Sequence, residues 1–156
     1  MQQIELTQGQ YAIVDDDDYD EINQFNWCFS HGYAVRAVTI SKGKRKWQRM
    51  HRLVTNCSAD MEVDHANHDK LDNRKSNLRV CSRSENNHNQ QILTYAKSSV
   101  YKGVSFYKRI GKWQAQIKLN NKNKSLGYFT NEIDAAIAYN VAAIELFGEF
   151  ALLNVI

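Results

Sequence analysis

The chain has 156 residues, of which 43% are hydrophobic and 24% charged, with a formal net charge of +3 and no proline. This length can bury one moderate hydrophobic core or two small ones, and the three widely spaced cysteines indicate neither a disulfide framework nor a zinc ribbon. The sequence has no apolar run of membrane-spanning length and no signal-peptide pattern at its N-terminus, so we expect a soluble cytoplasmic protein without a membrane partner.

The N-terminal third predicts strands and a short helix. Residues 10–14 read as a strand, and residues 16–25 read as a helix whose positive N-terminal end is favoured by the preceding aspartates. Segments 32–38 and 46–50 predict a β-hairpin around residues 41–43. The aspartates at 15–18 match the spacing of no calcium loop, so we expect them to cap the helix or to solubilise the surface. Trp27 and Trp47 are expected in the core.

Basic residues are concentrated in two segments. Residues 42–52 contain six Lys and Arg residues, and residues 86–131 contain no acidic residue. A long basic stretch without acids, interleaved with aromatic residues, is typical of proteins that bind a phosphate backbone. A solvated basic face is the alternative interpretation of such a stretch.

The most informative residues lie in the middle of the chain, where Asp64 and His65 are followed by Asn77 and Asn86. A carboxylate and an amide oxygen suit Mg²⁺ or Mn²⁺, which prefer oxygen ligands and keep several waters. The adjacent histidine can take a proton near neutral pH, as a general base must. The pattern therefore predicts a site that holds one divalent cation and activates a water molecule.

These residues, at this order and spacing over about residues 50–90, resemble the HNH (His-Me finger, ββα-metal) nucleases, and in particular their homing and phage-encoded branch. The resemblance implies that Asp64 is the first metal ligand and His65 the general base, both at the end of a first strand. It implies that Asn77 is the loop residue that orients the base, and that Asn86, on a closing helix, is the second metal ligand. Asn87 and Asn89 are alternatives to Asn86. His68 stands where this branch usually has a glycine in a tight turn.

The same resemblance implies hydrolysis of phosphodiester bonds to 5′-phosphate and 3′-hydroxyl ends. The cofactor would be one divalent cation, Mg²⁺ or Mn²⁺, and Arg74 would help to clamp a phosphate. A phage or mobile-element origin, and action in the cytoplasm of a bacterial host cell, follow as expectations.

The C-terminal third predicts three strands and a helix after a polar linker at 94–99. Segments 104–107, 113–118 and 124–129 alternate with the period of a strand. Asn131 is a helix-capping residue, and Gly148 stands near the expected helix end. Residues at helical spacing predict a mostly apolar stripe that would face the sheet. The stripe consists of Ile133, Ala136, Ile137, Asn140, Ala143, Ile144 and Phe147. Alanines at 135, 136, 138, 142 and 143 would let this helix lie close to the sheet.

Residues 98–154 resemble the plant ethylene-response-factor (Apetala-type) DNA-binding domain, through Tyr101-Lys102-Gly103-Val104, Leu126-Gly127-Tyr128-Phe129 and Ala135 to Tyr139. In that family a three-stranded sheet lies in the major groove and reads bases with its exposed face. The predicted DNA contacts are Lys102, Ser105, Tyr107, Arg109, Gln114, Gln116, Lys118 and Lys124. Most of the Arg and Trp residues with which that family reads bases are absent, so its sequence preference does not carry over.

We therefore predict an α+β protein with a nuclease domain at 1–95, carrying an N-terminal sheet extension, and a sheet-type DNA-binding domain at 98–156. The expected function is site-specific cleavage of double-stranded DNA. One metal centre cuts one strand at a time, so a double-strand break would need a homodimer or two sequential nicks. Two alternatives are a non-catalytic DNA-binding regulator that keeps the nuclease fold, and an RNA-directed nuclease.

Overall fold

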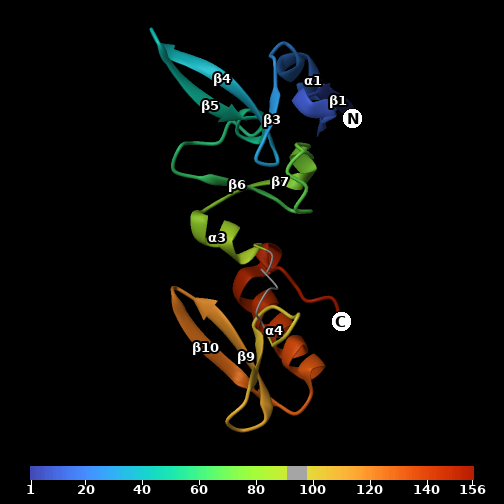
Figure 1. The fold of residues 1–156 in the computed structure, drawn as a ribbon, viewed down its shortest axis with the longest axis vertical. Coiled ribbons are helices and arrows are strands. Elements are labelled where there is room, and N and C mark those ends of the chain that lie inside the picture. Colours follow the sequence, from blue (N-terminus) through green and yellow to red (C-terminus); the bar gives the residue numbers. More distant parts are fainter. Residues whose placement is uncertain (91–97) are drawn as a thin grey trace. The chain divides into compact units, whose positions relative to one another are not determined.

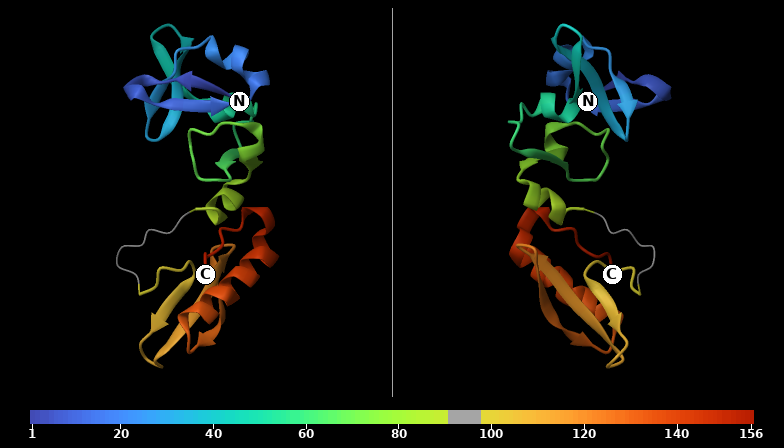
Figure 2. Two further views of the ribbon diagram at one scale, coloured as in Figure 1. Left: turned by 90° about the vertical axis from the view of Figure 1, so that its right-hand side faces the viewer. Right: turned by 60° about the vertical axis from the view of Figure 1, so that its left-hand side comes forward.

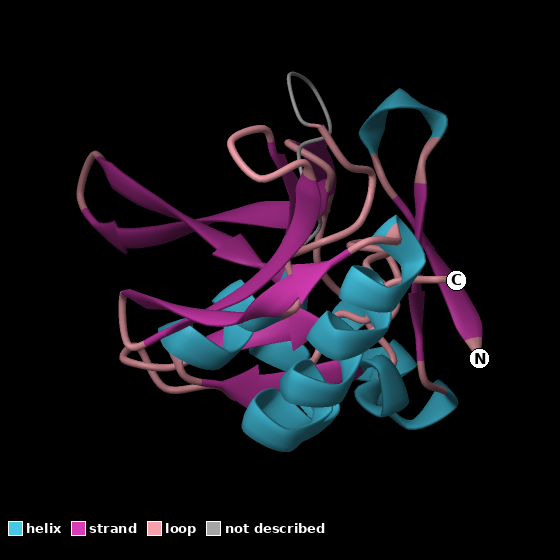
Figure 3. Ribbon diagram, turned by 90° about the horizontal axis from the view of Figure 1, so that it is seen from below, coloured by secondary structure: helices cyan, strands magenta, loops and turns pink. Residues whose placement is uncertain are grey.

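The computed structural model describes residues 1–90 and 98–156. The predicted linker at 94–99 and the predicted domain boundary at residue 95 lie wholly or partly outside these residues. The chain divides into two compact units, residues 1–86 and 87–156, each with its own core (Figure 1). Helices and strands both contribute, as the colours of Figure 3 show, which confirms the predicted α+β class.

The first unit begins with strands and short helices that together form the N-terminal extension. In chain order they are β1 (Gln2–Glu5), β2 (Tyr11–Val14), α1 (Asp16–Asn23), β3 (Cys28–Ser30), β4 (Tyr33–Ser41), β5 (Lys44–Arg49) and α2 (Met50–Val54), with a 3-10 turn at Thr7–Gly9. β1 pairs with β2, and β3, β4 and β5 form an antiparallel sheet. The sequence predicted β2, α1 and the β4–β5 hairpin, and it missed β1, β3 and α2.

The core of the extension is made of aliphatic side chains and one indole. Its buried members are Ile4, Leu6, Ala12, Val14, Ile22, Trp27, Ala34 and Met50. Trp27 lies there as predicted, with its ring nitrogen donating to the Ile22 carbonyl at 2.9 Å. The prediction for Trp47 was wrong, because this side chain is 66% exposed. The outer part of the β4–β5 hairpin extends beyond the core, so few of its residues are covered.

The rest of the first unit is a strand pair followed by a helix. β6 (Glu62–His65) and β7 (Leu78–Cys81) are antiparallel, with Asp64 opposite Arg79, and α3 (Arg83–His88) follows, with a 3-10 turn at Lys75–Asn77 before β7. Ser82 and Glu85 cap the N-terminus of α3 through two reciprocal hydrogen bonds. The Ser82 amide donates to the Glu85 carboxylate at 2.7 Å, and the Glu85 amide donates to Ser82 Oγ at 3.3 Å. This is a capping box.

The second unit is a three-stranded antiparallel sheet with one helix against it (Figure 2). Its elements are β8 (Val104–Tyr107), β9 (Lys112–Leu119), β10 (Lys122–Phe129) and α4 (Glu132–Phe147), followed by a 3-10 turn at Gly148–Phe150, and β9 is the central strand. Asn131 caps the helix as predicted, accepting from the Ile133 amide at 2.8 Å. Gly148 follows its last turn with a φ of 53°.

The residues of α4 that face the sheet differ from the predicted stripe. Ala135, Ala136, Tyr139, Ala142 and Ala143 are buried. The isoleucines expected at the sheet are instead 42 to 53% exposed; these are Ile133, Ile137 and Ile144. Small side chains let the helix axis approach the sheet closely, so the alanine face fits there and the branched side chains are turned outward. Within the described residues, no helix combines the length and the apolar character needed to cross a membrane.

Candidate active site

Asp64 and His65 are the last two residues of β6, as the resemblance implied. Both side chains are largely covered, with residue exposures of 7% and 5%. Adjacent residues of a strand point to opposite faces, so the two side chains have different surroundings. His65 packs beside Tyr33 and His51 of the N-terminal extension, whereas Asp64 lies beside Arg79 of β7. Burial makes the protonation state of His65 sensitive to its immediate partners.

Asn73 determines which nitrogen of His65 is basic. Its amide nitrogen donates to the Leu71 carbonyl at 3.1 Å, which directs its oxygen toward His65, where it lies 3.4 Å from Nε2. An amide oxygen accepts, so Nε2 carries the proton and Nδ1 is the basic nitrogen of the neutral ring. Asn73 is itself 1% exposed. The sequence analysis did not give this residue a role.

The imidazole of His65 is held in its neutral form. Burial lowers the pKa of His65 below its ordinary value, and the bond from Asn73 and the charge of Asp64 oppose this in part. A neutral ring at neutral pH can accept a proton, which is the state a general base needs.

Asn77 lies in the 3-10 turn at the end of the loop that joins β6 to β7. Its amide nitrogen donates to the Asp72 carbonyl at 2.8 Å, and its Oδ1 accepts from the Asn67 amide at 3.0 Å. One side chain thus holds both the beginning and the middle of the loop that follows His65. At His68 the backbone is left-handed, with φ 65°, so this position does need the conformation that glycine adopts most readily.

Arg74, predicted to clamp phosphate, makes a two-pronged ion pair with Asp72, at 2.6 and 2.8 Å. That hydrogen bonding keeps the pKa of Asp72 below its ordinary value. The Asp72 carboxylate also accepts from the Asn67 side chain at 2.9 Å. In this structure Arg74 therefore stiffens the loop beside the site.

Asp64, the first predicted metal ligand, accepts a hydrogen bond from Arg79 of β7. Its donor chemistry fits a hard divalent cation, and its pairing with a guanidinium shows that positive charge is accommodated at this carboxylate. Asn86 is half-buried on α3 and belongs to the same unit as Asp64. Nowhere in the described part of the chain do three His, Cys, Asp or Glu side chains gather as a metal cluster. The predicted ligand pair, Asp64 and Asn86, contains only one such side chain and is a different type of site.

The N-terminal extension is hydrogen-bonded directly to the loop that carries Asn73. The Ile13 amide donates to the Leu71 carbonyl and the Asn73 amide donates to the Ile13 carbonyl, each at 2.8 Å. The two bonds form an isolated parallel β-bridge between Ile13 of β2 and Asp72 of the loop. Because Asn73 touches His65, the position of the base depends on residues far earlier in the chain.

Two of the four aspartates at 15–18 also contact this loop, which was not predicted, while Asp16 and Asp17 are exposed in the first turn of α1. Asp15 precedes α1 but makes no side-chain cap to it. Instead its carboxylate accepts from the Lys75 amide at 2.7 Å, and Asp18 accepts from Lys75 Nζ at 2.5 Å. These aspartates hold the turn that contains Asn77.

Two aromatic rings from the extension pack beside His65. His51 lies 5.0 Å away between ring centroids, at 80°, and Tyr33 lies 6.1 Å away. His51 is 3% exposed, and burial, together with the charge of His65, lowers its pKa to about 3. The burial of His51 supports a structural role for this residue.

In the second unit, several of the predicted DNA contacts share the face of the sheet that is turned away from α4. Cross-strand pairing places Ser105 opposite Gln114, and Gln116 opposite Ser125, while Ala115 and Ile117 alternate onto the helix side. The residues brought together on this open face are Ser105, Tyr107, Gln114, Gln116 and Lys118, with Tyr128.

The other predicted contacts lie elsewhere. Lys124 pairs with Ile117, so it is on the helix side of the sheet. Lys102 Nζ donates to the His88 and Gln90 carbonyls, at 2.6 and 2.9 Å. Arg109 is exposed in the β8–β9 turn.

Comparison with known proteins agrees with these observations. A family model described as HNH endonuclease matches residues 56–88. The chain is also 30% identical over 152 residues to an uncharacterized HNH endonuclease of Acanthamoeba polyphaga mimivirus, covering 94% of this chain and 75% of that protein. The chain therefore belongs to the HNH endonuclease family.

Part of the chain is similar to parts of plant proteins. Over 59 residues the chain is 42% identical to an AP2-like ethylene-responsive transcription factor of Arabidopsis thaliana, covering 36% of this chain and 12% of that protein. It is equally similar to APETALA2-like protein 2 of Oryza sativa subsp. japonica, covering 38% of this chain and 14% of that protein. These matches concern a part of this chain and a small part of each relative.

Proposed function

We propose that this protein is a site-specific endonuclease that hydrolyses double-stranded DNA with one divalent cation, Mg²⁺ or Mn²⁺. The observation that supports this most directly is the state of His65. It is buried, neutral and fixed in one tautomer by Asn73. It stands next to a carboxylate that family resemblance assigns to a metal.

In the proposed reaction, His65 Nδ1 takes a proton from a water molecule that attacks the scissile phosphorus in line. Asn73 accepts from Nε2–H and so stabilises the imidazolium that forms. Asp64 and Asn86 would hold the cation, which when bound supplies positive charge to a phosphate oxygen and to the departing 3′ oxygen. Asn77 keeps the loop after His65 in place through its two hydrogen bonds.

Recognition is assigned to the open face of the β8–β10 sheet. Gln114 and Gln116 carry side chains that can bond adenine in the major groove, and Lys118 can reach guanine or phosphate. Lys102 and Lys124 are less suited to base contact, because one is bonded to backbone carbonyls and the other lies on the helix side.

A plasmid-nicking assay tests the activity, with Mg²⁺ or Mn²⁺ and with a chelator as control. We expect metal-dependent nicking that His65→Ala reduces by about a hundred- to ten-thousand-fold. DNA binding by the variant should be nearly unchanged, since the residue lies outside the recognition sheet. Nicking at the wild-type rate by His65→Ala would exclude it as the base.

The ligand assignment on α3 has its own matched set of variants. Asp64→Ala should weaken metal binding more than Asn86→Ala, because the carboxylate carries the charge, and extra metal should partly rescue Asn86→Ala. Asn87→Ala is the control, since Asn87 is exposed. A dead Asn87→Ala or Asn89→Ala beside an active Asn86→Ala would move the ligand to the other residue.

The same purified protein distinguishes the nuclease from the two alternatives, a non-catalytic DNA-binding regulator and an RNA-directed nuclease. A regulator would bind duplex DNA and nick none under any metal condition, and an RNA-directed nuclease would prefer RNA in competition binding. If duplex DNA is cut, the ratio of nicked to linear product at increasing protein concentration shows whether two copies act together.

A further inference from the structure

Tyr33 is the first residue of β4 and forms one edge of the active site. Its ring centroid lies 6.1 Å from that of His65 and 5.4 Å from that of His51. The side chain is half-buried, so one part packs on the histidines and another part remains accessible. Groups held on this ring therefore lie next to the proposed general base.

Two cationic side chains are held on the Tyr33 ring, and they come from different parts of the first unit. Arg49, the last residue of β5, has its guanidinium carbon 4.5 Å from the ring centroid. Lys70, in the loop after β6, has Nζ 4.7 Å from the same centroid. Cation–π attraction favours this placement of both side chains. The Tyr33 ring thus has two positive charges within 4.7 Å of its centroid, and the same ring packs beside His65.

Neither cation is neutralised by an acidic side chain. Among the described residues, the ion pairs formed by side chains involve Arg74, Lys75 and Arg79, and neither Arg49 nor Lys70 takes part in one. Both residues are exposed. Each cation is therefore available to an anion, and a phosphate that contacted both would gain two attractive interactions.

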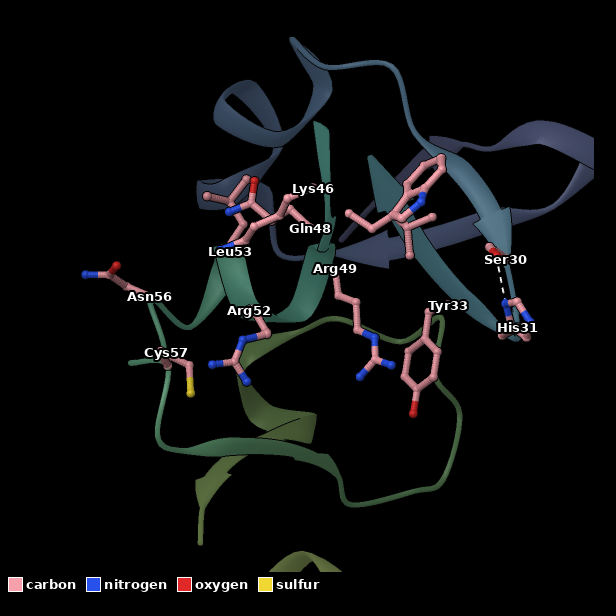
Figure 4. Close-up of a pocket in the computed structure, with 13 residues that line it drawn as sticks. Ser30, His31, Tyr33, Lys46, Gln48, Arg49, Arg52, Leu53, Asn56 and Cys57 are labelled. Carbon is pink, nitrogen blue, oxygen red and sulfur yellow. Dashed lines mark hydrogen bonds between the residues drawn. The ribbon is translucent and has the colours of Figure 1, made fainter. Parts of the chain in front are cut away.

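The surface beside Arg49 is a cavity of about 650 Å³ that continues the basic character. Lys46, Arg49 and Arg52 line it, and among the described residues that line it none is Asp or Glu. In Figure 4 the Arg49 guanidinium lies beside the Tyr33 ring. Arg52 is already bonded to the carbonyls of Ser58 and Met61, so Arg49 and Lys46 are the cations available to a ligand.

We propose that Arg49 and Lys70, positioned by Tyr33, bind a backbone phosphate of the cleaved DNA strand. This phosphate is the neighbour of the phosphate at which the strand is cut. The inference rests on the proposed function and adds to it a specific role for the N-terminal extension. A strand that enters over Lys46 and meets the paired cations is held at the position where its next phosphate can reach His65. The extension then positions the substrate as well as the base.

The first test compares single-turnover nicking of plasmid DNA at saturating protein. Arg49→Ala and Lys70→Ala should each lower the rate by about tenfold or more, because a misplaced reacting group costs up to about a hundredfold. The double variant should lose less than the product of the two losses, since both side chains hold one phosphate. Lys44→Ala, which removes an exposed cation at the far end of β5, is the matched control and should keep the wild-type saturated rate.

Variants of Tyr33 test the ring itself. Tyr33→Phe keeps an aromatic face for the two cations, so it should nick at close to the wild-type rate. Tyr33→Leu removes that face and should reproduce the loss seen in Arg49→Ala. If Tyr33→Phe is as impaired as Tyr33→Leu, the hydroxyl of Tyr33 is required, and the proposal that its ring positions the two cations is wrong.

Binding to a labelled random-sequence duplex, with chelator present and at a series of salt concentrations, separates this inference from the proposed activity. Each lost phosphate contact should reduce the log–log salt slope by about 0.9, and the double variant should lose about one such contact in total. If wild-type protein nicks DNA while Arg49→Ala and Lys70→Ala match Lys44→Ala in both assays, the phosphate site is refuted and the nuclease stands. If no DNA is nicked but the slope changes as stated, the activity fails and the binding site stands.

Discussion

As the proposed general base, His65 should set the pH range in which the protein cleaves DNA. Its pKa is lowered by burial, and a general base acts only when it is unprotonated. Because the pKa of His65 is lowered, the cleavage rate should decline with falling pH only below the ordinary histidine pKa of about 6.5. The measurement is the single-turnover nicking rate against pH at saturating metal. An acid limb that breaks above pH 6.5 would show that His65 is not buried and neutral in the active protein.

Asn73 should affect both the rate and the position of that limb. Its hydrogen bond raises the pKa of His65 against the effect of burial, so Asn73→Leu should move the acid limb to still lower pH. The rate on the plateau should also fall, because nothing then fixes Nε2 as the protonated nitrogen. A loss of rate without any displacement of the limb would indicate that Asn73 supports only the loop.

His51 should make the first unit sensitive to acid. Its pKa is about 3 in the folded protein, against about 6.5 when unfolded. Between these values the unfolded chain binds more protons, so the free energy of unfolding should fall as pH drops from about 6.5 toward 3. His51→Phe should flatten this dependence in thermal unfolding scans. His31→Gln, at an exposed histidine, is the control, and equal slopes for all three proteins would contradict the assignment.

Sequence spacing was sufficient for the residues that are close together in the chain. Asp64, His65 and Asn77 lie where the resemblance placed them, at the end of β6 and in the following loop. Asn73 and Tyr33 were missed for different reasons. Asn73 stands within the motif without a distinctive neighbour pattern, and Tyr33 reaches His65 only through the folding of a separate sheet.

At the level of elements, the close contact between α4 and the sheet requires a glycine at position 103, just before β8. Gly103 has φ +75°, and a Cβ there would lie 2.0 Å from the Tyr139 ring. Gly103→Ala should therefore destabilise the second unit by about 3 kcal/mol or more, from overlap added to backbone strain. Gly111→Ala is the matched control, because its φ is +64° with nothing within 4 Å, so it should cost about 1–2 kcal/mol. Denaturant unfolding of both variants measures the difference.

The elements of the second unit were predictable because its strands alternate and its helix is capped. The face of α4 was predictable only in part: the alanines lie at the sheet as their small size indicates, but the isoleucines expected beside them are exposed. In the first unit, β1 and β3 are short, with burial patterns that show no regular alternation. Their pairing partners, not their own sequences, make them strands.

For the whole molecule, deleting residues 98–156 should separate cutting from recognition. The first unit has its own core and all residues of the proposed site, so the shortened protein should fold and nick DNA with little site preference. Its affinity for duplex DNA should fall and vary less steeply with salt. Cleavage maps of both proteins on one plasmid provide the measurement. Retention of the full-length cleavage pattern would place recognition in the first unit.

The two backbone hydrogen bonds between Ile13 and the loop at Leu71 and Asn73 also bear on how such enzymes can be recombined. A chimera that borrowed residues 56–88, the span of the family match, would inherit the acid, the base and both amides but would lose the strand that steadies them. A chimera joined after residue 86 would inherit a finished catalytic unit. We therefore expect recognition domains to be exchangeable, by engineering or during evolution, when the junction follows residue 86. Exchanges with a junction between β2 and the loop at Leu71 and Asn73 should give inactive proteins.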